Sequence, residues 1–208
     1  MKFVKFSTCL LLLVLVTIPW TICQFIVGKP CPYPEKRPVI QNFDLDRYVD
    51  GKWYEILRYE QHFEIGCDCN FATYTKTPKN GIKVKNCCKR SRHAQTSCVE
   101  GSAYVSYPKA GPVEGKLNVT FSGPPDNSNY WILATDYENY SIVYSCKNIS
   151  DEKSAEAAWL LSKQRTLNPI ISDEANNLIN NYFQRDEMRI TRQDSNLCDH
   201  NQNHFHLN

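Results

Sequence analysis

Cysteine carries most of the potential chemistry in this chain. The sequence has ten cysteines, and two of them, Cys9 and Cys23, fall in an apolar N-terminal segment. The remaining set is even: Cys31, Cys67, Cys69, Cys87, Cys88, Cys98, Cys146 and Cys198. Thiols can bind zinc, act as nucleophiles or form disulfides. Zinc sites usually leave about two to four residues between paired cysteines. Cys67 and Cys69 are closer than that and Cys87 and Cys88 are adjacent, so we expect no metal site.

The N-terminal segment decides between the other two chemistries. Met1–Cys23 combines Lys2 and Lys5 with an apolar run and with small residues just before Gln24. This pattern is typical of a secretory signal peptide, cleaved near Gln24. The alternative, a membrane anchor, would need an uninterrupted apolar stretch of about 18 residues or more. We therefore expect a secreted, extracellular protein in which residues 24–208 form a single domain with up to four disulfides.

Charge and composition exclude several partners. With Lys2 and Lys5 removed, basic and acidic residues balance, so nothing predicts nucleic-acid binding. No second hydrophobic segment follows, so we expect no transmembrane segment. Three glycosylation sequons suit a secreted chain. They begin at Asn118, Asn139 and Asn148.

Other catalytic motifs are missing from the sequence. It contains no G-x-S-x-G, no H-E-x-x-H and no glycine-rich phosphate loop, so we assign no catalytic residue. His62 and His93 fall in expected loops with no partner for a triad nearby in sequence. The other histidines, His200, His204 and His206, lie in a polar tail and are expected to be solvated.

The elements that must position these residues are mostly strands. Aromatic and β-branched runs alternate with turn signals such as Asn80-Gly81 at short, regular spacing, which indicates an antiparallel sandwich or barrel. The expected strands are Trp53–Tyr59, Cys69–Lys76, Ile82–Cys88, Cys98–Tyr107, Lys116–Phe121, Tyr130–Thr135, Tyr140–Cys146 and Met188–Thr191.

Three other segments depart from this pattern. Gly28–Pro38 holds four prolines and reads as an extended arm. Asn42–Gly51 suits one short helical turn. Ser172–Arg185 predicts a helix in which Ser172 is the N-cap and Leu178, Ile179 and Tyr182 share one face. Ala155–Ser162 has helical propensity, and its state stays open from the residues alone.

Alternation along Ile82–Cys88 indicates a lined interior. Ile82, Val84, Asn86 and Cys88 share one face, while lysines occupy the other. An inward wall of apolar residues with an occasional amide suits a cavity for an apolar ligand that has one polar end. An amide satisfied by a neighbour or by water is the alternative.

Two motifs resemble the lipocalin family. Gly51-Lys52-Trp53 resembles the GxW signature, and Thr135-Asp136-Tyr137 resembles the later TDY signature. The string YWILATDYENYSIVYSC (130–146) is similar to the apolipoprotein D-like branch, and the resemblance runs from about Cys31 to Cys198. It implies an all-β fold, an eight-stranded antiparallel up-and-down barrel with one C-terminal α-helix packed outside. It also implies that Ala155–Ser162 is the eighth strand.

The resemblance assigns structural roles as well. Trp53 would close one end of the barrel beneath an arginine, but Lys163 stands at the matching position and Arg165 follows two residues later. Either side chain could take that role. By the same resemblance, disulfides would join Cys31 to Cys146 and Cys69 to Cys198. For the other four we expect Cys88–Cys98 and Cys67–Cys87, although Cys67 could replace Cys69 as the partner of Cys198.

The resemblance further implies a carrier of a small hydrophobic ligand, such as a bilin, retinoid, sterol or fatty acid. The residues at matching cavity positions are Tyr48, Tyr74, Asn86, Tyr130, Trp159 and Leu161. We expect no cofactor other than such a bound bilin or lipid, and no enzymatic activity. One alternative is an interaction protein with a filled barrel whose loops contact a cell-surface receptor or a protease. Another is a thiol-dependent lipid peroxide enzyme that uses a free Cys88.

Overall fold

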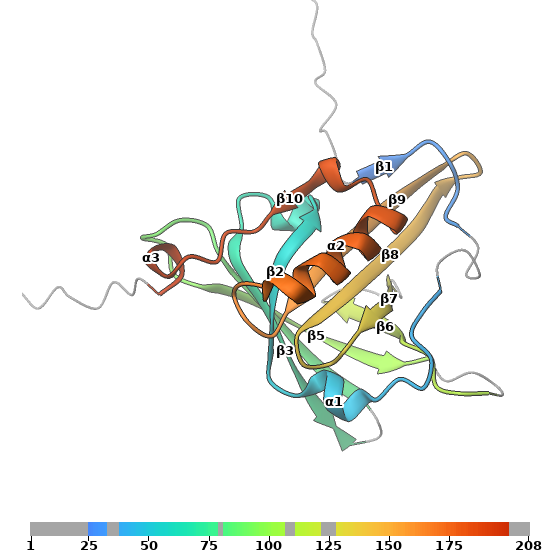
Figure 1. Cartoon of the computed structure of the whole chain (residues 1–208), viewed down its shortest axis with the longest axis horizontal. Coiled ribbons are helices and arrows are strands. Elements are labelled where there is room, and N and C mark those ends of the chain that lie inside the picture. The colour runs from blue at the N-terminus through green and yellow to red at the C-terminus, as the bar shows by residue number, and fades with distance from the viewer. Residues whose placement is uncertain (1–24, 33–37, 79–80, 107–110, 122–127, 200–208) are drawn as a thin grey trace, which may run out of the picture.

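The computed structural model describes residues 25–32, 38–78, 81–106, 111–121 and 128–199. The expected signal peptide, Asn80 and the three tail histidines lie outside these ranges. The described residues contain three α-helices, two short 3-10 helices and a single ten-stranded antiparallel sheet (Figure 1).

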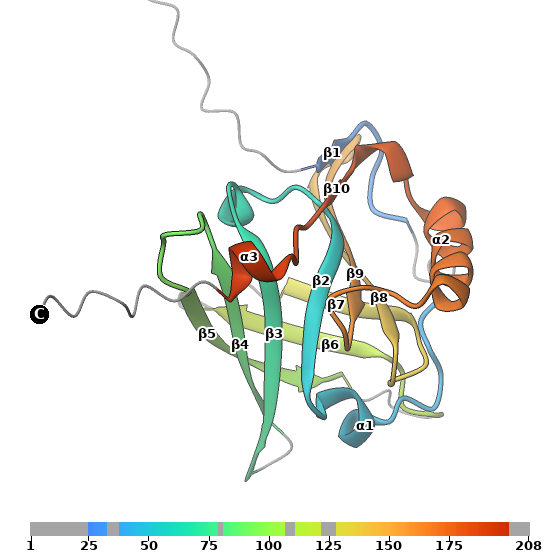
Figure 2. The same cartoon turned by 60° about the vertical axis from the view of Figure 1, so that its left-hand side comes forward.

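The sheet closes into a barrel. Strands β2 to β9 pair in sequence order, and β9 also pairs with β2, so these eight strands form a closed ring (Figure 2). Short strands β1 and β10 extend the sheet beside β9 and β2. The strands are β1 (Phe25–Val27), β2 (Lys52–Tyr59), β3 (Asp68–Thr77), β4 (Gly81–Lys89), β5 (Ser97–Val105), β6 (Lys116–Phe121), β7 (Ser128–Thr135), β8 (Tyr140–Ser150), β9 (Lys153–Ser162) and β10 (Met188–Ile190). The expected eight-stranded barrel is confirmed.

The eighth strand of the barrel shows tertiary pairing overriding local propensity. β9 contains AEAAWLLS, which has helical propensity, yet it pairs with β8 from Tyr140↔Ser162 to Ser150↔Lys153. A strand that completes backbone hydrogen bonds to neighbours on both sides is stabilised more than an isolated helix of the same length would be. β1 was not expected from the sequence, since three residues give too little pattern.

The helices lie outside the barrel. They are α1 (Leu45–Val49), α2 (Pro169–Tyr182) and α3 (Ser195–Cys198), with the 3-10 helices η2 (His62–Glu64) and η4 (Arg185–Glu187). α2 lies across the outer face of β8 and β9 (Figures 1 and 2). Its face of Leu178, Ile179 and Tyr182 packs against the barrel as expected. The expectation that Ser172 caps α2 is wrong, because the helix begins at Pro169, a residue whose fixed φ suits a first helical position.

Hydrophobic residues gather in two clusters, one on each side of the barrel wall. The outer cluster joins the wall to α2 and includes Tyr144 and Ile179. The inner cluster fills one end of the barrel and includes Trp53, Val84 and Val143. The inner cluster does not extend through the whole interior, which leaves space above it.

Four disulfides pair all the cysteines within the described residues. Cys31 bonds to Cys146 and Cys69 to Cys198, as the resemblance implied. The other two expected pairings are wrong. The structure has Cys67–Cys88 and Cys87–Cys98.

The register of β4 explains the correction. Cys87 lies directly opposite Cys98 across the β4–β5 ladder, whereas Cys88 lies opposite Ser97. Adjacent strand residues point to opposite faces, so Cys88 is directed away from Cys98 and bonds to Cys67. The free Cys88 thiol that the lipid peroxide enzyme alternative requires is therefore not available.

Candidate ligand-binding site

Trp53 anchors the closed end of the barrel. Its ring is fully buried, and its indole N–H donates to the backbone carbonyl of Tyr48 at 2.8 Å. The ammonium group of Lys163 lies 4.1 Å from the centroid of the Trp53 ring and donates to the Asp50 carbonyl. Burial lowers the pKa of Lys163 below its ordinary value, and nearby Asp50 opposes that shift. Lys163, not Arg165, therefore covers Trp53.

Arg165 has a different role. Its guanidinium forms a two-pronged ion pair with Asp199, at 2.9 and 2.6 Å, and lies near the Tyr54 ring. This contact ties the end of β9 to the C-terminal segment on the outside of the barrel.

The Asp136 carboxylate orders the turn between β7 and β8. One oxygen accepts hydrogen bonds from the backbone N–H groups of Glu138, Asn139 and Tyr140 at 2.7 to 3.1 Å. Thr135 donates to the Tyr140 carbonyl at 2.6 Å. Tyr137 adopts a positive φ of 69°, which this dense bonding supports.

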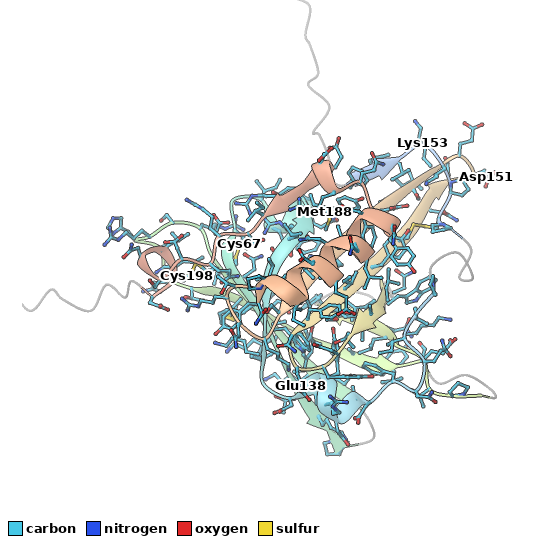
Figure 3. All side chains as sticks on the ribbon, viewed as in Figure 1. Cys67, Glu138, Asp151, Lys153, Met188 and Cys198 are labelled. Atoms are coloured by element: carbon cyan, nitrogen blue, oxygen red, sulfur yellow. A yellow bond between two sulfur atoms is a disulfide. The ribbon has the colours of Figure 1, made fainter. Side chains whose placement is uncertain are left out.

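This turn lies at the closed end beside α1. The Tyr137 hydroxyl accepts from the Asp44 backbone N–H at 3.1 Å, and Arg47 of α1 pairs with Glu138 at 2.9 Å. Figure 3 shows Glu138 at this end of the barrel, opposite Asp151 and Lys153 of the β8–β9 turn.

Above the closed end lies a cavity of about 920 Å³. Aromatic and aliphatic side chains form much of its wall, and several amides and carboxyls interrupt them. Exposed residues among the lining, such as Phe63, Lys147 and Ile149, mark its mouth. The lining residues are Trp53, Glu55, Gln61, Phe63, Glu64, Asn70, Phe71, Ala72, Tyr74, Val84, Asn86, Cys87, Val119, Phe121, Asn129, Tyr130, Ser145, Lys147, Asn148, Ile149, Ala155, Glu156, Ala157, Trp159 and Leu161.

The structure brings most of the expected ligand-binding residues to this wall. Those that line the cavity are Tyr74, Asn86, Tyr130, Trp159 and Leu161. Tyr48 is not among the lining residues; it is 1% exposed and packs on Trp53 beneath the cavity. Whether these six residues contact a ligand stays a prediction.

Three tyrosine hydroxyls connect Tyr48 to the cavity floor. The Tyr74 and Tyr130 hydroxyls lie 3.1 Å apart, and the Tyr130 and Tyr48 hydroxyls lie 3.4 Å apart. Tyr48 continues the chain to Ser141 at 3.2 Å. Burial raises the pKa of Tyr74 to about 12 and raises the pKa of Tyr130 and Tyr48 as well, so all three hydroxyls stay protonated at neutral pH.

A charged cluster was missed by the sequence reasoning. Arg58 of β2 is 0% exposed, and its guanidinium contacts Glu55 at 2.6 Å and Glu60 at 2.7 Å. It also donates to the carbonyls of Glu64 and Cys67 at 2.9 and 3.1 Å. One sequence signal could have indicated this cluster. The segment WYEILRYE is mostly apolar and aromatic but also contains Glu55, Arg58 and Glu60, and simple alternation of inward and outward residues does not explain these charges.

Glu64 connects this cluster to the cavity. One of its oxygens accepts from the Trp159 indole N–H at 3.3 Å. Its other oxygen is buried without a hydrogen-bond partner and lies 3.9 Å from the Arg58 guanidinium. Burial, followed by the nearby charge of Glu55, raises the pKa of Glu64 well above its ordinary value.

The sequons differ in their surroundings. The Asn118 amide is half-buried and donates to the Ser106 hydroxyl. The exposed Asn139 amide donates to Asp136 at 2.7 Å, and exposed Asn148 accepts from the Cys31 N–H at 2.6 Å. Glycosylation at these three positions stays a prediction.

Comparison with known proteins places this fold and its motifs in one family. A family model described as a lipocalin-like domain matches residues 43–191. The chain belongs to the lipocalin family. Among similar proteins, apolipoprotein D of Macaca fascicularis is 34% identical over 177 residues, covering 83% of this chain and 86% of that protein. The bilin-binding protein of Pieris brassicae is 34% identical over 152 residues, covering 72% of this chain and 75% of that protein.

Solved structures show the same lipocalin fold. Insecticyanin of Manduca sexta superposes with a TM-score of 0.70 at 24% identity, covering 84% of this chain and 92% of that one. Lobster apocrustacyanin A1 gives a TM-score of 0.67 at 19% identity, with 82% and 92% covered. In this lipocalin, no helix of the described residues has the length and apolar character needed to span a membrane.

Proposed function

We propose that this lipocalin is a secreted carrier that binds one small hydrophobic molecule inside its barrel. The observation that carries the proposal is the cavity of about 920 Å³ above Trp53. Ligand pockets commonly enclose about 300 to 1,000 Å³ with mostly apolar walls and a few polar groups. A cavity of this size favours carriage over the alternative of a filled barrel that acts only through its loops.

Burial of apolar ligand surface would supply the binding free energy. Each Å² removed from water contributes roughly 25 cal/mol. Rings such as Tyr130 and Trp159, whose centroids lie 6.3 Å apart with an interplanar angle of 25°, offer a rigid surface for a flat ligand. The bilin-binding protein supports a bilin as one candidate ligand. Retinoids, sterols and fatty acids are the other candidates.

The test is native mass spectrometry of the protein purified from its own secretions, with an absorbance spectrum of the same sample. We expect a small apolar molecule that is released on denaturation, and a visible band if it is a bilin. A bare mass after allowance for disulfides and glycans, together with no binding across a lipid panel, would favour the filled-barrel alternative.

A matched pair of variants tests whether the ligand binds inside the cavity. Ala157→Trp places a large ring at a lining position and should weaken binding at least tenfold, because it occupies ligand volume. Lys153→Trp on exposed β9 surface adds the same ring outside the cavity and should leave binding unchanged. Equal affinities for the two variants would place the ligand elsewhere.

A further inference from the structure

The cavity wall presents unpaired hydrogen-bond acceptors. Among the described residues, several lining side chains hold a buried oxygen that has no hydrogen-bond partner. They are Glu64 Oε2, Asn70 Oδ1, Asn86 Oδ1 and Glu156 Oε1. No buried side-chain nitrogen of the described residues is left in that state. Because an unpaired buried polar atom is costly, the occupant of this cavity should bring donors.

Asn70 shows that the cavity wall needs hydrogen-bond donors rather than acceptors. It is 7% exposed, and its amide nitrogen donates to Glu55 Oε2 at 3.4 Å. A carboxylate accepts hydrogen bonds from an N–H group, so the amide cannot turn its oxygen toward Glu55. The Asn70 oxygen therefore remains the unpaired acceptor, and it belongs to a residue in contact with the charged cluster.

Charge pairing leaves Glu64 as the unmatched acid of that cluster. Glu55 and Glu60 each lie within 2.7 Å of an Arg58 nitrogen. Asp68 pairs with Arg189 at 2.8 Å and with Arg192 at 2.7 Å. The cationic partner of Glu64 is the Arg58 nitrogen at 3.9 Å, and that guanidinium is already engaged by closer acceptors. The other neighbours of the Glu64 carboxyl are the Trp159 N–H and the acidic side chain of Glu55.

Aromatic rings adjoin the same carboxyl. The Trp159 indole donates to Glu64, and the Tyr130 ring stacks on Trp159. Aromatic faces attract cations, so rings beside an unmatched carboxyl suit a positively charged nitrogen carried on an apolar body. The described cation among the lining residues is Lys147, which is exposed at the mouth.

We propose that the cavity selects a hydrophobic amine, whose protonated nitrogen contacts Glu64 and Asn70 while its apolar body lies against Trp159 and Tyr130. This inference rests on the proposed carrier function and names the head group of its ligand. A ligand carboxylate would instead meet Glu64 and the unpaired acceptors in the interior, and would have to remain near Lys147 at the rim.

Proton release gives the amine a distinct signature. Burial and Glu55 hold the pKa of Glu64 high, so its carboxyl is protonated in the empty cavity more than an ordinary glutamate would be, and in that state it hydrogen-bonds to Glu55. Glu64 Oε2 is an unpaired acceptor only when the carboxyl is ionised. The charged groups that face it are Glu55 and Arg58 of β2, and β9 adds the Trp159 N–H. A bound ammonium stabilises the carboxylate, so the proton leaves as the amine binds.

The experiment compares three probes that share one body: naphthylethylamine, naphthylethanol and naphthylacetate. Isothermal titration calorimetry on the full chain should show the amine binding roughly tenfold tighter than the alcohol, and naphthylacetate binding more weakly than either. Glu64→Gln should bring the amine-to-alcohol ratio of affinities to about one. Glu60→Gln removes an acid from the same cluster outside the cavity and should keep the ratio.

A second measurement needs no variant. Titrations of the wild-type protein in buffers of different ionisation enthalpy should show up to about one proton released per amine bound and none per alcohol. Tightest binding by naphthylacetate, or an amine preference that persists in Glu64→Gln, would overturn the proposal. Alcohol or acid binding without amine preference would leave the carrier function standing. No binding by any probe or by the lipid panel would overturn both.

Discussion

The ammonium nitrogen of Lys163 lies 4.1 Å from the centroid of the Trp53 ring and donates to the Asp50 carbonyl. Asp50 precedes Gly51, whose φ of +69° sets the turn into β2. Lys163 therefore covers the buried Trp53 ring and also stabilises the turn at Asp50 and Gly51 that precedes Trp53. The long aliphatic stem of lysine packs on the ring while its charged end reaches the carbonyl.

Replacing Lys163 should loosen the closed end. Lys163→Met keeps the stem but loses the cation–π contact and the hydrogen bond, so we expect a loss of about 1–2 kcal/mol in unfolding free energy by urea denaturation. Lys163→Arg preserves both contacts and should remain near wild type. Lys83→Met, a lysine on the outer face paired with exposed Glu100, should change stability by less than about 1 kcal/mol. Equal losses at Lys163 and Lys83 would argue against a specific role for the Trp53 contact.

Asp136 should make the turn between β7 and β8 sensitive to acid. Burial alone would raise the pKa of Asp136, but hydrogen bonds from the Asn139 side chain and the turn backbone bring it below its ordinary value. A folded pKa below the unfolded one means that this stabilisation is complete above the unfolded pKa and is lost as the pH falls through the folded pKa.

Asp136→Asn should therefore lower the melting temperature at neutral pH, with a cost of about 1–3 kcal/mol from weakened hydrogen bonds. The difference from wild type should shrink in acid, where the wild-type carboxylate is protonated too. Glu138→Gln serves as a control because its pair with Arg47 is exposed. A difference that stays constant from neutral to acidic pH would show that the charge of Asp136 is not responsible.

The antiparallel strands could be predicted from the sequence because their signals are local. Asn80-Gly81, the alternating lysines of β4 and the Thr135-Asp136-Tyr137 turn each mark a strand or a connection. These signals left a sandwich and a barrel open, and the closed eight-stranded barrel was expected only from the lipocalin resemblance. The state of β9 could not be read from its own residues. Its alanines and leucines favour a helix, and only pairing with β8 and β2 makes it a strand.

The site was harder to predict because it depends on register. Which cysteine bonds to Cys98 depends on whether Cys87 or Cys88 lies opposite it, and a shift of one residue reverses the answer. Similarly, β2 has a bulge between Glu55 and Leu57. A bulge interrupts strict alternation, so the sequence pattern did not indicate the buried position of Arg58.

The disulfides should differ in their contributions to stability. The Cys31–Cys146 bond spans 115 residues, whereas Cys87–Cys98 spans 11. In the chain-entropy model these separations correspond to about 5 and about 3 kcal/mol. We expect Cys31→Ser/Cys146→Ser to lower the unfolding free energy more than Cys87→Ser/Cys98→Ser, as measured by urea denaturation. Equal losses would indicate that native contacts, rather than loop closure, set these contributions.

Arg58 should be among the costliest charged residues to remove. Arg58→Met keeps much of the side-chain volume but leaves Glu55 and Glu60 without their closest cation in a buried site, so we expect a loss of about 3–5 kcal/mol. Removing the cation also takes away a charge that lowers the pKa of Glu64, so the folded state of the variant binds a proton at Glu64 more readily. The loss should therefore be largest at neutral pH and should decrease as the pH falls and Glu64 becomes protonated.

Arg165→Met provides the matched control, because its pair with Asp199 lies at the surface and should contribute less than about 1 kcal/mol. Urea denaturation of both variants across the acidic and neutral range separates the two cases. A cost for Arg58→Met that is independent of pH would mean that lost packing dominates, and that the carboxyls around Arg58 do not depend on its charge.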